Sequence, residues 1–491
     1  MDLSEITISG LQAGYAAGDY TAAEAVAWYL DRIERIDRAG PRLNAVISVN
    51  PEVAAQAEAL DDRMRAGGAV GPLHGVPVLV KDQIDAAETP TTLGSVMFRD
   101  NHPKRDAFVI ATLREAGALI LGKTTLGEMG AGDTHGSLFG STRNPYDLER
   151  TAGGSSGGSG AAVSANLCAV ALGQEGYASI RRPSIWNGVA GMRPSIGLVS
   201  RGNVYDGWPS TMGSVGPMCR TVEDCAKLLD AIAGYDPTDP STALGVGRTP
   251  ESFSAGLSAD ALRGRRIGVL RTVMGHASEP DAEDFARIEA VFESGLAALR
   301  EAGAELVDPI EIEGLVALKA LRAAHPEDTA GAFDHYVSGL ADPPFRNRDE
   351  AMASPLYAET LPGVKRRWEA PASFEAFGRY AAARELLRIR MLDVMARHRL
   401  DAIVHKAVEH EPTLIRDGVN PPFVNMKGAP HINTFLGDVP SVVVPAGFTS
   451  AGLPGGITFL GRPYDDAAML AYAHAFEAVS GARRPPVFEG V

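Results

Sequence analysis

The sequence predicts an α/β protein in which helices cover both faces of a largely parallel or mixed β-sheet. Three stretches carry this prediction, because in each a helical apolar pattern runs into a short apolar segment typical of a buried strand. They are residues 106–124, 285–309 and 385–405. Helices that alternate with buried strands are typical of layered α/β domains. No internal repeat is visible, so we expect the whole chain, 1–491, to form one large domain.

Helix starts and one irregular stretch complete the expected organisation. Two residue pairs have the spacing of a capping box: Thr21 with Glu24, and Thr221 with Asp224. In a capping box, the side chain of each residue accepts a hydrogen bond from the backbone amide of the other. Residues 309–375 are rich in charge and proline. We expect this stretch to be an insertion or cap within the domain, built of irregular helices.

Composition excludes several classes of function. The net charge of −15 repels phosphate backbones, so we expect no nucleic-acid partner. The three cysteines, Cys168, Cys219 and Cys225, form no CxxC pair, which favours reduced thiols and a cytoplasmic location over disulfides or a structural metal. No secretory signal or membrane-spanning stretch is visible, so we expect no membrane partner.

One motif matches a phosphate-binding loop by its letters alone. The segment "GALILGKT" at 117–124 satisfies G-x-x-x-x-G-K-[ST]. In a P-loop the four variable residues are an exposed loop, whereas here they are Ala-Leu-Ile-Leu, which favour a buried strand. A strand cannot also cradle phosphates, so we interpret this motif as a strand followed by a turn.

A second motif is dense in glycine and serine. "TAGGSSGGSGAA" at 151–162 fits the nucleophile elbow G-x-S-x-G in two frames, centred on Ser155 and Ser156. The preceding "NPYDLERTA" does not read as the strand that an elbow needs. A flexible linker is also disfavoured, because the stretch continues into the apolar "AAVSANLCAVAL". Glycines packed this densely before a helix indicate a backbone that bends tightly and approaches another group closely.

Two more residues complete a pattern. Lys81 directly follows the apolar strand "VPVLV", and Ser179 lies in "YASIR", 24 residues after Ser155. With the Gly/Ser loop, this combination resembles the amidase signature family of serine hydrolases. The resemblance runs in the family's order over nearly the whole chain, through "LHGVPVLVKDQI", "TTLGS", "LREAGALILGKTTLGEMGAG", "NPYDLERTAGGSSGGSGAAV", "SIRRPSIWNGVAGMRPSIGLVSR", "GSVGPMCRTVED" and "VPSVVVPAGFTSAGLPGGITFLGRP".

The resemblance implies a role for each of these residues. Lys81 is implied as the buried base, Ser155 as a bridging serine held by a cis peptide, and Ser179 as the nucleophile. The fold implied is the amidase signature fold, with its core at 65–235 and with no cofactor or metal. The implied oxyanion hole consists of the backbone amides of Gly176, Tyr177, Ala178 and Ser179.

The chemistry of such a site is intelligible from the residue types. Serine needs a base to take its proton. A lysine serves only when neutral, so burial must lower its pKa from about 10.4 to near 7. The apolar strand before Lys81 can supply that desolvation. In the implied site, Ser155 relays the proton between Ser179 and Lys81.

The chain departs from the family beside the nucleophile. The usual block is of the type "GTDTGGSIR", whereas this chain has "GQEGYASIR". Glu175 stands in place of aspartate and can still support the site by pairing with Arg181. Tyr177 and Ala178 replace two glycines, which strains the turn if either position needs a positive φ.

We expect hydrolysis of a small amide through an acyl-enzyme on Ser179, with an aryl amide (anilide) or an aryl urea as the substrate. The residues expected to line an aromatic-friendly pocket are Met129, Tyr177, Trp186 and Trp208. The alternatives are a subunit of a tRNA-dependent amidotransferase and an allophanate-type or urea-type hydrolase. Assembly statistics favour a homodimer if the chain associates with itself.

Overall fold

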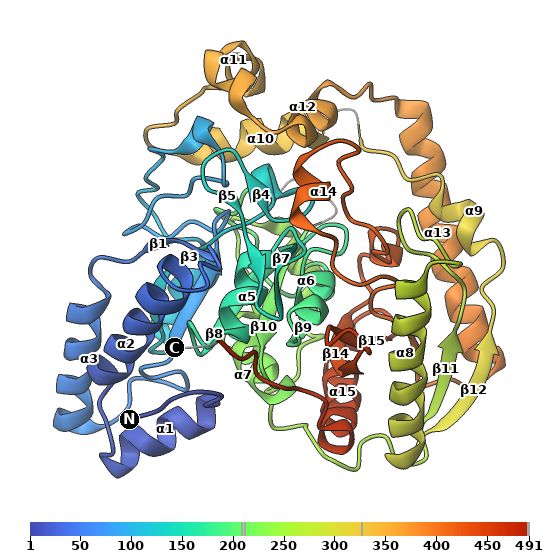
Figure 1. The fold of residues 1–491 in the computed structure, drawn as a ribbon, viewed down its shortest axis with the longest axis horizontal. Coiled ribbons are helices and arrows are strands. Elements are labelled where there is room, and N and C mark those ends of the chain that lie inside the picture. The colour runs from blue at the N-terminus through green and yellow to red at the C-terminus, as the bar shows by residue number, and fades with distance from the viewer. Residues whose placement is uncertain (208–209, 211–212, 326–327, 489–491) are drawn as a thin grey trace.

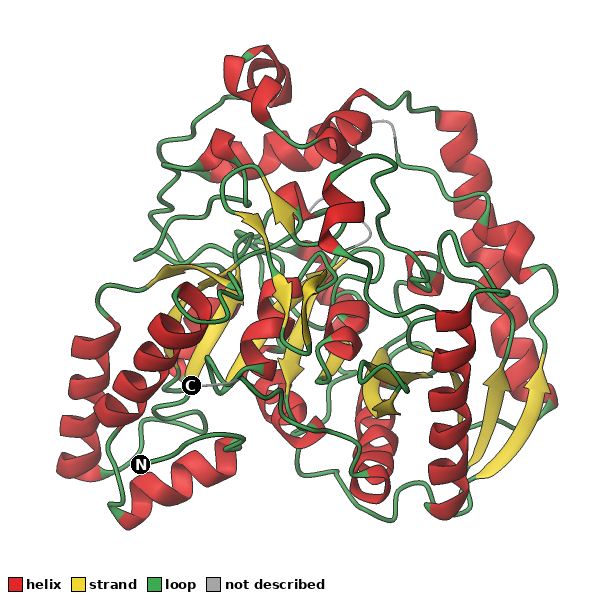
Figure 2. Cartoon of the chain, viewed as in Figure 1, coloured by secondary structure: helices red, strands yellow, loops and turns green. Residues whose placement is uncertain are grey.

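A computed structural model describes residues 1–488 except 208–209, 211–212 and 326–327, and its central element is an eleven-stranded mixed β-sheet (Figures 1 and 2). In spatial order the strands are β1 (Val46–Val49), β3 (Leu119–Thr124), β2 (Pro77–Lys81), β8 (Val170–Glu175), β10 (Ser214–Cys219), β9 (Ala190–Arg193), β14 (Ser441–Phe448), β15 (Pro454–Leu460), β13 (Ala402–Lys406), β11 (Arg266–Leu270) and β12 (Glu305–Ile310). Two small hairpin sheets pair β4 (His135–Gly136) with β5 (Gly140–Ser141), and β6 (Arg143–Asn144) with β7 (Asp147–Thr151).

Helices surround this sheet, as Figure 2 shows in red. The α-helices are α1 (Ile8–Ala17), α2 (Ala22–Arg32), α3 (Val53–Gly67), α4 (Phe108–Glu115), α5 (Gly157–Ser164), α6 (Arg181–Trp186), α7 (Val222–Ile232), α8 (Glu283–Glu301), α9 (Leu315–Lys319), α10 (Asp328–Gly339), α11 (Arg348–Ala353), α12 (Pro362–Glu369), α13 (Phe374–Arg397), α14 (Ile415–Val419) and α15 (Asp466–Ser480). A π-helical turn, η1 (Ile33–Arg38), extends α2. The 3₁₀ turns are η2 (Val96–Phe98), η3 (Glu128–Gly130), η4 (Pro240–Gly245), η5 (Pro355–Glu359) and η6 (Ile432–Thr434).

The expected α/β fold is confirmed, and each of the three helix-to-strand stretches forms as predicted. They are α4 with β3, α8 with β12, and α13 with β13. The middle of the sheet is buried on both faces: α5 and α6 pack on it together, and α4, α7 and α15 pack as a second group of helices. No helix in the described part of the chain is long and apolar enough to cross a membrane.

The three parallel strands β3, β2 and β8 position the chemistry. β2 pairs in parallel with both neighbours, with Val78 opposite Val170 and Val80 opposite Leu172. Because the carboxyl ends of parallel strands meet at one edge of a sheet, Lys81 at the end of β2 lies beside the end of β8. The turn that leads to Ser179 starts at that same edge, since β8 ends at Glu175.

The phosphate-loop motif is a strand, as the sequence indicates. Residues 119–124 form β3, which is buried along its whole length. Its lysine, Lys123, is fully buried and pairs with the equally buried Asp82, with 3.3 Å between Nζ and Oδ1. Neither the backbone nor this lysine is open to a phosphate.

Two local predictions differ from the structure. Thr21 and Glu24 form a complete capping box, but Thr221 and Asp224 form only half of one. Thr221 accepts from the amide of Asp224, whereas the carboxylate of Asp224 accepts from the amide of Ile8 instead of returning to the start of its own helix.

The second difference concerns "NPYDLERTA", which contains the strand β7 (Asp147–Thr151). The sequence argument that no strand precedes the Gly/Ser loop is therefore wrong. The strand escaped detection because it belongs to a partly exposed hairpin outside the main sheet, so its residues show no apolar pattern.

Residues 309–375 form α9 to α12 between the end of β12 and the start of α13, and α10 to α12 lie at the top of Figure 1. Aromatic side chains of this segment pack against the loops that follow β2 and β9. For example, Phe333 contacts the rings of Phe98 and Tyr205, with 5.9 Å and 6.3 Å between ring centroids. The boundaries of an insertion or cap at 309–375 stay a prediction.

Candidate active site

Lys81 is the central group of the site. Its side chain is fully buried, and Nζ lies 2.7 Å from Oγ of Ser155 and 3.0 Å from the carbonyl oxygen of Gln174. Burial lowers the pKa of Lys81 to about 7, although the negative charges of Asp206 and Glu175 oppose this shift. Near neutral pH a large share of this amine is therefore uncharged and able to accept a proton from Ser155 along the 2.7 Å contact.

The Gly/Ser loop holds Ser155 against this amine. The peptide bond between Gly154 and Ser155 is cis, as the resemblance implies. Gly154 has no room for a side chain, since a Cβ there would lie 2.3 Å from the carbonyl oxygen of Gly132. Arg182 donates to the carbonyl of Gly154 at 2.8 Å and pairs with Asp133 at 2.7 Å. Close backbone approach and a buried cation thus fix the position of this loop.

Ser156 has a different environment from Ser155. Its hydroxyl donates to the carbonyl of Gln174 at 3.2 Å and lies 3.3 Å from the amide of the same residue, which donates to it. Its own amide donates to the carbonyl of Ser179 at 3.1 Å. Ser155 and Ser156 are both fully buried, so neither has the exposed hydroxyl that a nucleophile elbow presents.

Ser179 ends a turn whose backbone amides are available. Its residue is 8 % exposed, unlike the fully buried Ser155. Among the described residues, none accepts a hydrogen bond from the amides of residues 176–179. A run of amides beside a serine can stabilise the negative charge that develops on a carbonyl oxygen under attack.

Glu175 holds this turn from outside. Its carboxylate accepts from the amides of Ile180 at 2.9 Å and Arg181 at 3.0 Å. It also pairs with the Arg181 guanidinium at 2.7 Å and lies 3.8 Å from Nε of Arg193. Burial alone would raise the pKa of Glu175, but the two arginines and the amides outweigh burial and lower it. Glu175 is therefore ionised. Its carboxylate fixes the two ends of the turn and accepts no hydrogen bond from the amides in the middle of the turn.

Comparison with known proteins agrees with this geometry. A family model described as Amidase matches residues 24–470. The chain belongs to the amidase signature family. It is 34 % identical to a glutamyl-tRNA(Gln) amidotransferase subunit of Gloeobacter violaceus over 96 % of each chain. A peptide amidase from Stenotrophomonas maltophilia superposes with a TM-score of 0.88 at 33 % identity over 99 % of each chain. A bacterial aryl acylamidase gives 0.79 at 26 % identity over 96 % of each chain.

The two departures from the amidase block cause no backbone strain. Neither Tyr177 nor Ala178 has a positive φ, so the turn accepts side chains at both positions. The Tyr177 ring stacks on His431 with 4.5 Å between ring centroids, and its hydroxyl lies 2.8 Å from Nδ1 of that histidine. The guanidinium of Arg322 lies 4.7 Å from the centroid of the tyrosine ring. The tyrosine thus ties the turn to the loop around residue 431.

The predicted pocket residues have different surroundings. Met129 is fully buried in the aromatic cluster formed with α10 and α12, and Trp186 is fully buried with Nε1 donating to the carbonyl of His410 at 3.0 Å. Trp208 lies outside the described residues. A substrate contact through these side chains stays a prediction. Among the three members of this set that the structure describes, Tyr177 retains partial exposure.

Sequence reasoning missed three residues that shape the site. Arg182 and Arg193 are buried arginines that fix the Gly/Ser loop and Glu175, and Asp206 acts on the charge of Lys81. Arg193 carries a signal in the sequence, because it follows the apolar "GVAGM", where a charge is costly unless it is paired. Arg182 follows another arginine among serines, so its burial has no such signal. Asp206 carries no such signal, since it lies in a polar loop.

The first prediction concerns the identity of the nucleophile. A fluorophosphonate probe should label the wild type, and Ser179→Ala should abolish the labelling, because the probe reacts with the activated hydroxyl beside the free amides. Ser156→Ala should keep the label. Mass spectrometry of the labelled peptide provides the measurement. A label on Ser155 or Ser156 would show that the assignment of Ser179 is wrong.

The second prediction concerns Glu175. Glu175→Gln leaves two buried arginines without their carboxylate, so the free energy of unfolding should fall by about 3 kcal/mol. Denaturant unfolding of wild type and variant measures the difference. Glu305→Gln is the matched control, because that carboxylate forms an exposed pair with Arg266 and should change stability by less than about 1 kcal/mol. Equal effects of the two substitutions would contradict the structural role given to Glu175.

Proposed function

We propose that this chain is an amidase that hydrolyses a small amide through an acyl-enzyme on Ser179. The observation that carries the proposal is the contact of 2.7 Å between Nζ of a buried Lys81 and Oγ of Ser155. A lysine whose pKa burial has lowered to about 7 is a base suited to neutral pH. The run of free amides at residues 176–179 supports the same chemistry.

In the proposed first half-reaction, Oγ of Ser179 attacks the carbonyl carbon of the substrate. The hydroxyl proton of Ser179 passes to Oγ of Ser155, whose own proton passes to Nζ of Lys81. The carbonyl oxygen becomes an oxyanion, which the amides of residues 176–179 stabilise. The protonated amine then returns the proton through Ser155 to the leaving nitrogen, the C–N bond breaks, and an ester on Ser179 remains.

In the second half-reaction, water attacks the ester by the same relay. The water proton passes through Ser155 to Lys81, a second oxyanion forms, and the proton returns to Oγ of Ser179 as the C–O bond breaks. The products are an amine and a carboxylic acid from an amide, or an amine and a carbamic acid from a urea. No step needs a metal or an organic cofactor.

For the substrate we propose an aryl amide (anilide) or an aryl urea. The similarity to a solved structure named as an aryl acylamidase supports this class. So does the aromatic cluster of Phe98, Tyr205 and Phe333, which adjoins the loop of Met129. The similarity to a peptide amidase adds the terminal amide of a peptide as a second substrate class to be tested.

The main alternative is a subunit of a tRNA-dependent amidotransferase. The similarity to curated proteins of that name, 34 % identity over 96 % of the chain, favours it. The tyrosine and alanine beside Ser179 argue against it, because that subunit usually keeps the standard block. The fold likeness is also higher to the peptide amidase, with a TM-score of 0.88, than to the Thermotoga maritima amidotransferase subunit, with 0.77. An allophanate-type or urea-type hydrolase is a further alternative.

The third prediction concerns pH. Only the neutral amine of Lys81 accepts a proton, so kcat/KM should rise with pH through about 7 and become constant above it. Lys81→Arg retains a cation that cannot deprotonate and should be as inactive as Lys81→Ala. Lys427→Arg, at a pair near the surface, is the matched control and should keep the wild-type profile. An active Lys81→Arg variant would overturn the proposed base.

The fourth prediction concerns the substrate. In a panel with a constant acyl group, the anilide should exceed the aliphatic amide in kcat/KM by at least about tenfold, because an aromatic leaving group adds apolar contact. The purified chain alone should catalyse this reaction. Activity on glutamine that appears only with added partner proteins would favour the amidotransferase instead.

A further inference from the structure

A cavity of about 530 Å³ is lined by none of Lys81, Ser155 and Ser179. Its walls come from Ile196, Arg201 and Ser210, from η4, from α13 and from the segment 435–438. This volume is within the range of sites for small organic ligands.

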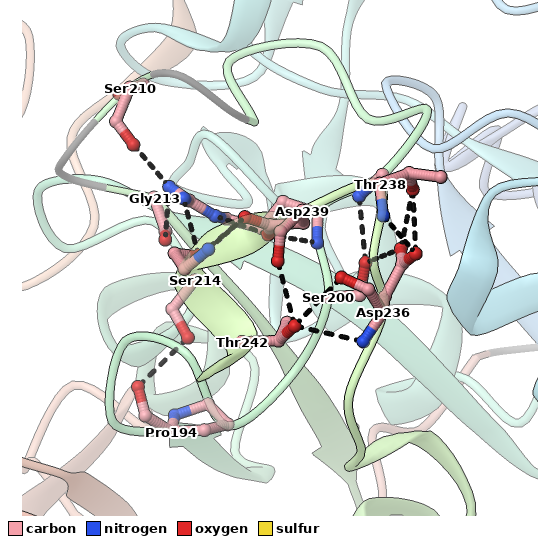
Figure 3. A network of polar contacts seen from close by, with 12 residues as sticks. Pro194, Ser200, Ser210, Gly213, Ser214, Asp236, Thr238, Asp239 and Thr242 are labelled. Carbon is pink, nitrogen blue, oxygen red and sulfur yellow. Dashed lines mark hydrogen bonds and ion pairs between the residues drawn. The ribbon is translucent and has the colours of Figure 1, made fainter. Parts of the chain in front are cut away.

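One wall of the cavity is built rigidly around Arg201. This buried guanidinium pairs with Asp239 at 3.2 Å and donates to the carbonyl of Gly213 at 3.3 Å and to the hydroxyl of Ser241 at 3.1 Å. Figure 3 shows the surrounding network, in which Asp236 accepts from the hydroxyls of Ser200 and Thr238. These contacts fix the wall before any ligand binds.

Arg384 is the arginine of the described cavity lining that lacks an ion pair, although the nearby charges balance. Arg201 is neutralised by Asp239, and Arg388 by Asp438 at 3.1 Å and by Glu385 at 2.7 Å. Arg384 has no ion pair within the described chain, and its Nε is shielded from solvent without a hydrogen-bond partner there. Its guanidinium carbon lies 5.7 Å from the ring of Tyr380. A guanidinium without a carboxylate partner can form charge-assisted hydrogen bonds with the carboxylate of a ligand.

Part of the remaining lining is apolar. Ile196, Leu244 and Phe435 face the same cavity, and Leu244 is 52 % exposed, which is unusual for a large apolar side chain. We propose that this cavity binds a small carboxylate with an apolar body, the carboxylate paired with Arg384 and the body packed against these three side chains. Arginine suits this ligand because its planar guanidinium can bind both oxygens of a carboxylate.

Gly437 connects the cavity with the candidate active site. Its carbonyl accepts from Nη1 of Arg193 at 3.3 Å, and Nε of Arg193 lies 3.8 Å from the carboxylate of Glu175. Glu175 in turn fixes the turn that carries Ser179. A ligand on Arg384 therefore acts beside the arginine that supports Glu175, and its binding should change the rate of amide hydrolysis. This coupling rests on the proposed function, whereas binding itself does not.

The test uses 4-phenylbutyrate as the probe and isothermal titration calorimetry on the full chain. The wild type should bind one equivalent saturably at micromolar to millimolar concentrations, and Arg384→Ala should weaken binding at least about tenfold. The neutral 4-phenylbutan-1-ol should bind at least about tenfold more weakly, because it cannot pair with the guanidinium. Arg390→Ala is the matched control on α13, since that arginine pairs with Glu313 and does not line the cavity.

Leu244→Asp is a second variant at an exposed position, where folding is not at risk, and its negative charge should weaken binding of the probe as well. The proposed site would be wrong if the wild type showed no saturable binding of the probe. It would also be wrong if binding were unchanged in both Arg384→Ala and Leu244→Asp. Binding of the probe at the candidate active site would leave the affinity unchanged in both variants. The rate of amide hydrolysis with and without the probe tests the coupling. The probe should change the rate of the wild type and leave the rate of Arg384→Ala constant. An unchanged wild-type rate would refute the coupling but not the binding site.

Discussion

A lysine amine that is buried at the end of a central strand, so that its pKa falls to about 7, is the constraint on which the site depends. The strand before Lys81 is apolar and covered on both faces, so water does not reach Nζ to solvate an ammonium ion. Burial lowers the pKa to about 7, and the acids that act on it, Asp206 and Glu175, oppose the shift without cancelling it. Glu175 has this limited effect because its charge is already matched by Arg181 and Arg193. The arginines therefore serve the lysine as well as the turn.

The same balance explains why so many charges lie inside this part of the fold. Three buried cations near the loop are paired with acids: Arg182 with Asp133, Arg181 with Glu175 and Lys123 with Asp82. Removing one member of such a pair leaves the other uncompensated, so these contacts specify the arrangement of the loops strongly. The backbone of the Gly/Ser loop can approach its neighbours because its glycines present no Cβ. Paired charges and close backbone approach together set the distance between Lys81 and Ser155.

Much of this arrangement could be predicted from the sequence, and the limits have physical causes. Alternation of helical and apolar segments predicts the strands β3, β12 and β13, because burial on both faces selects continuous apolar residues. The hairpin strand β7 was missed, since a partly exposed strand needs no such pattern. The resemblance implied Lys81, Ser155 and Ser179, but the side-chain partners of Tyr177 lie 254 and 145 positions away, at His431 and Arg322, and no local pattern reveals contacts of that kind. The burial of Met129 and Trp186 is likewise set by the tertiary packing of distant helices.

The central claim is that Lys81 is neutral near physiological pH, and a direct titration of its amine tests it. The chain would be labelled with ¹³C at the lysine ε-carbons, and the resonance absent from Lys81→Arg would identify Lys81. Lys319, whose pKa burial lowers to about 8, provides a second shifted signal that Lys81→Arg leaves in place. The account predicts a midpoint for Lys81 at about 7. A midpoint near 10.4, roughly the value of an exposed lysine, would contradict it.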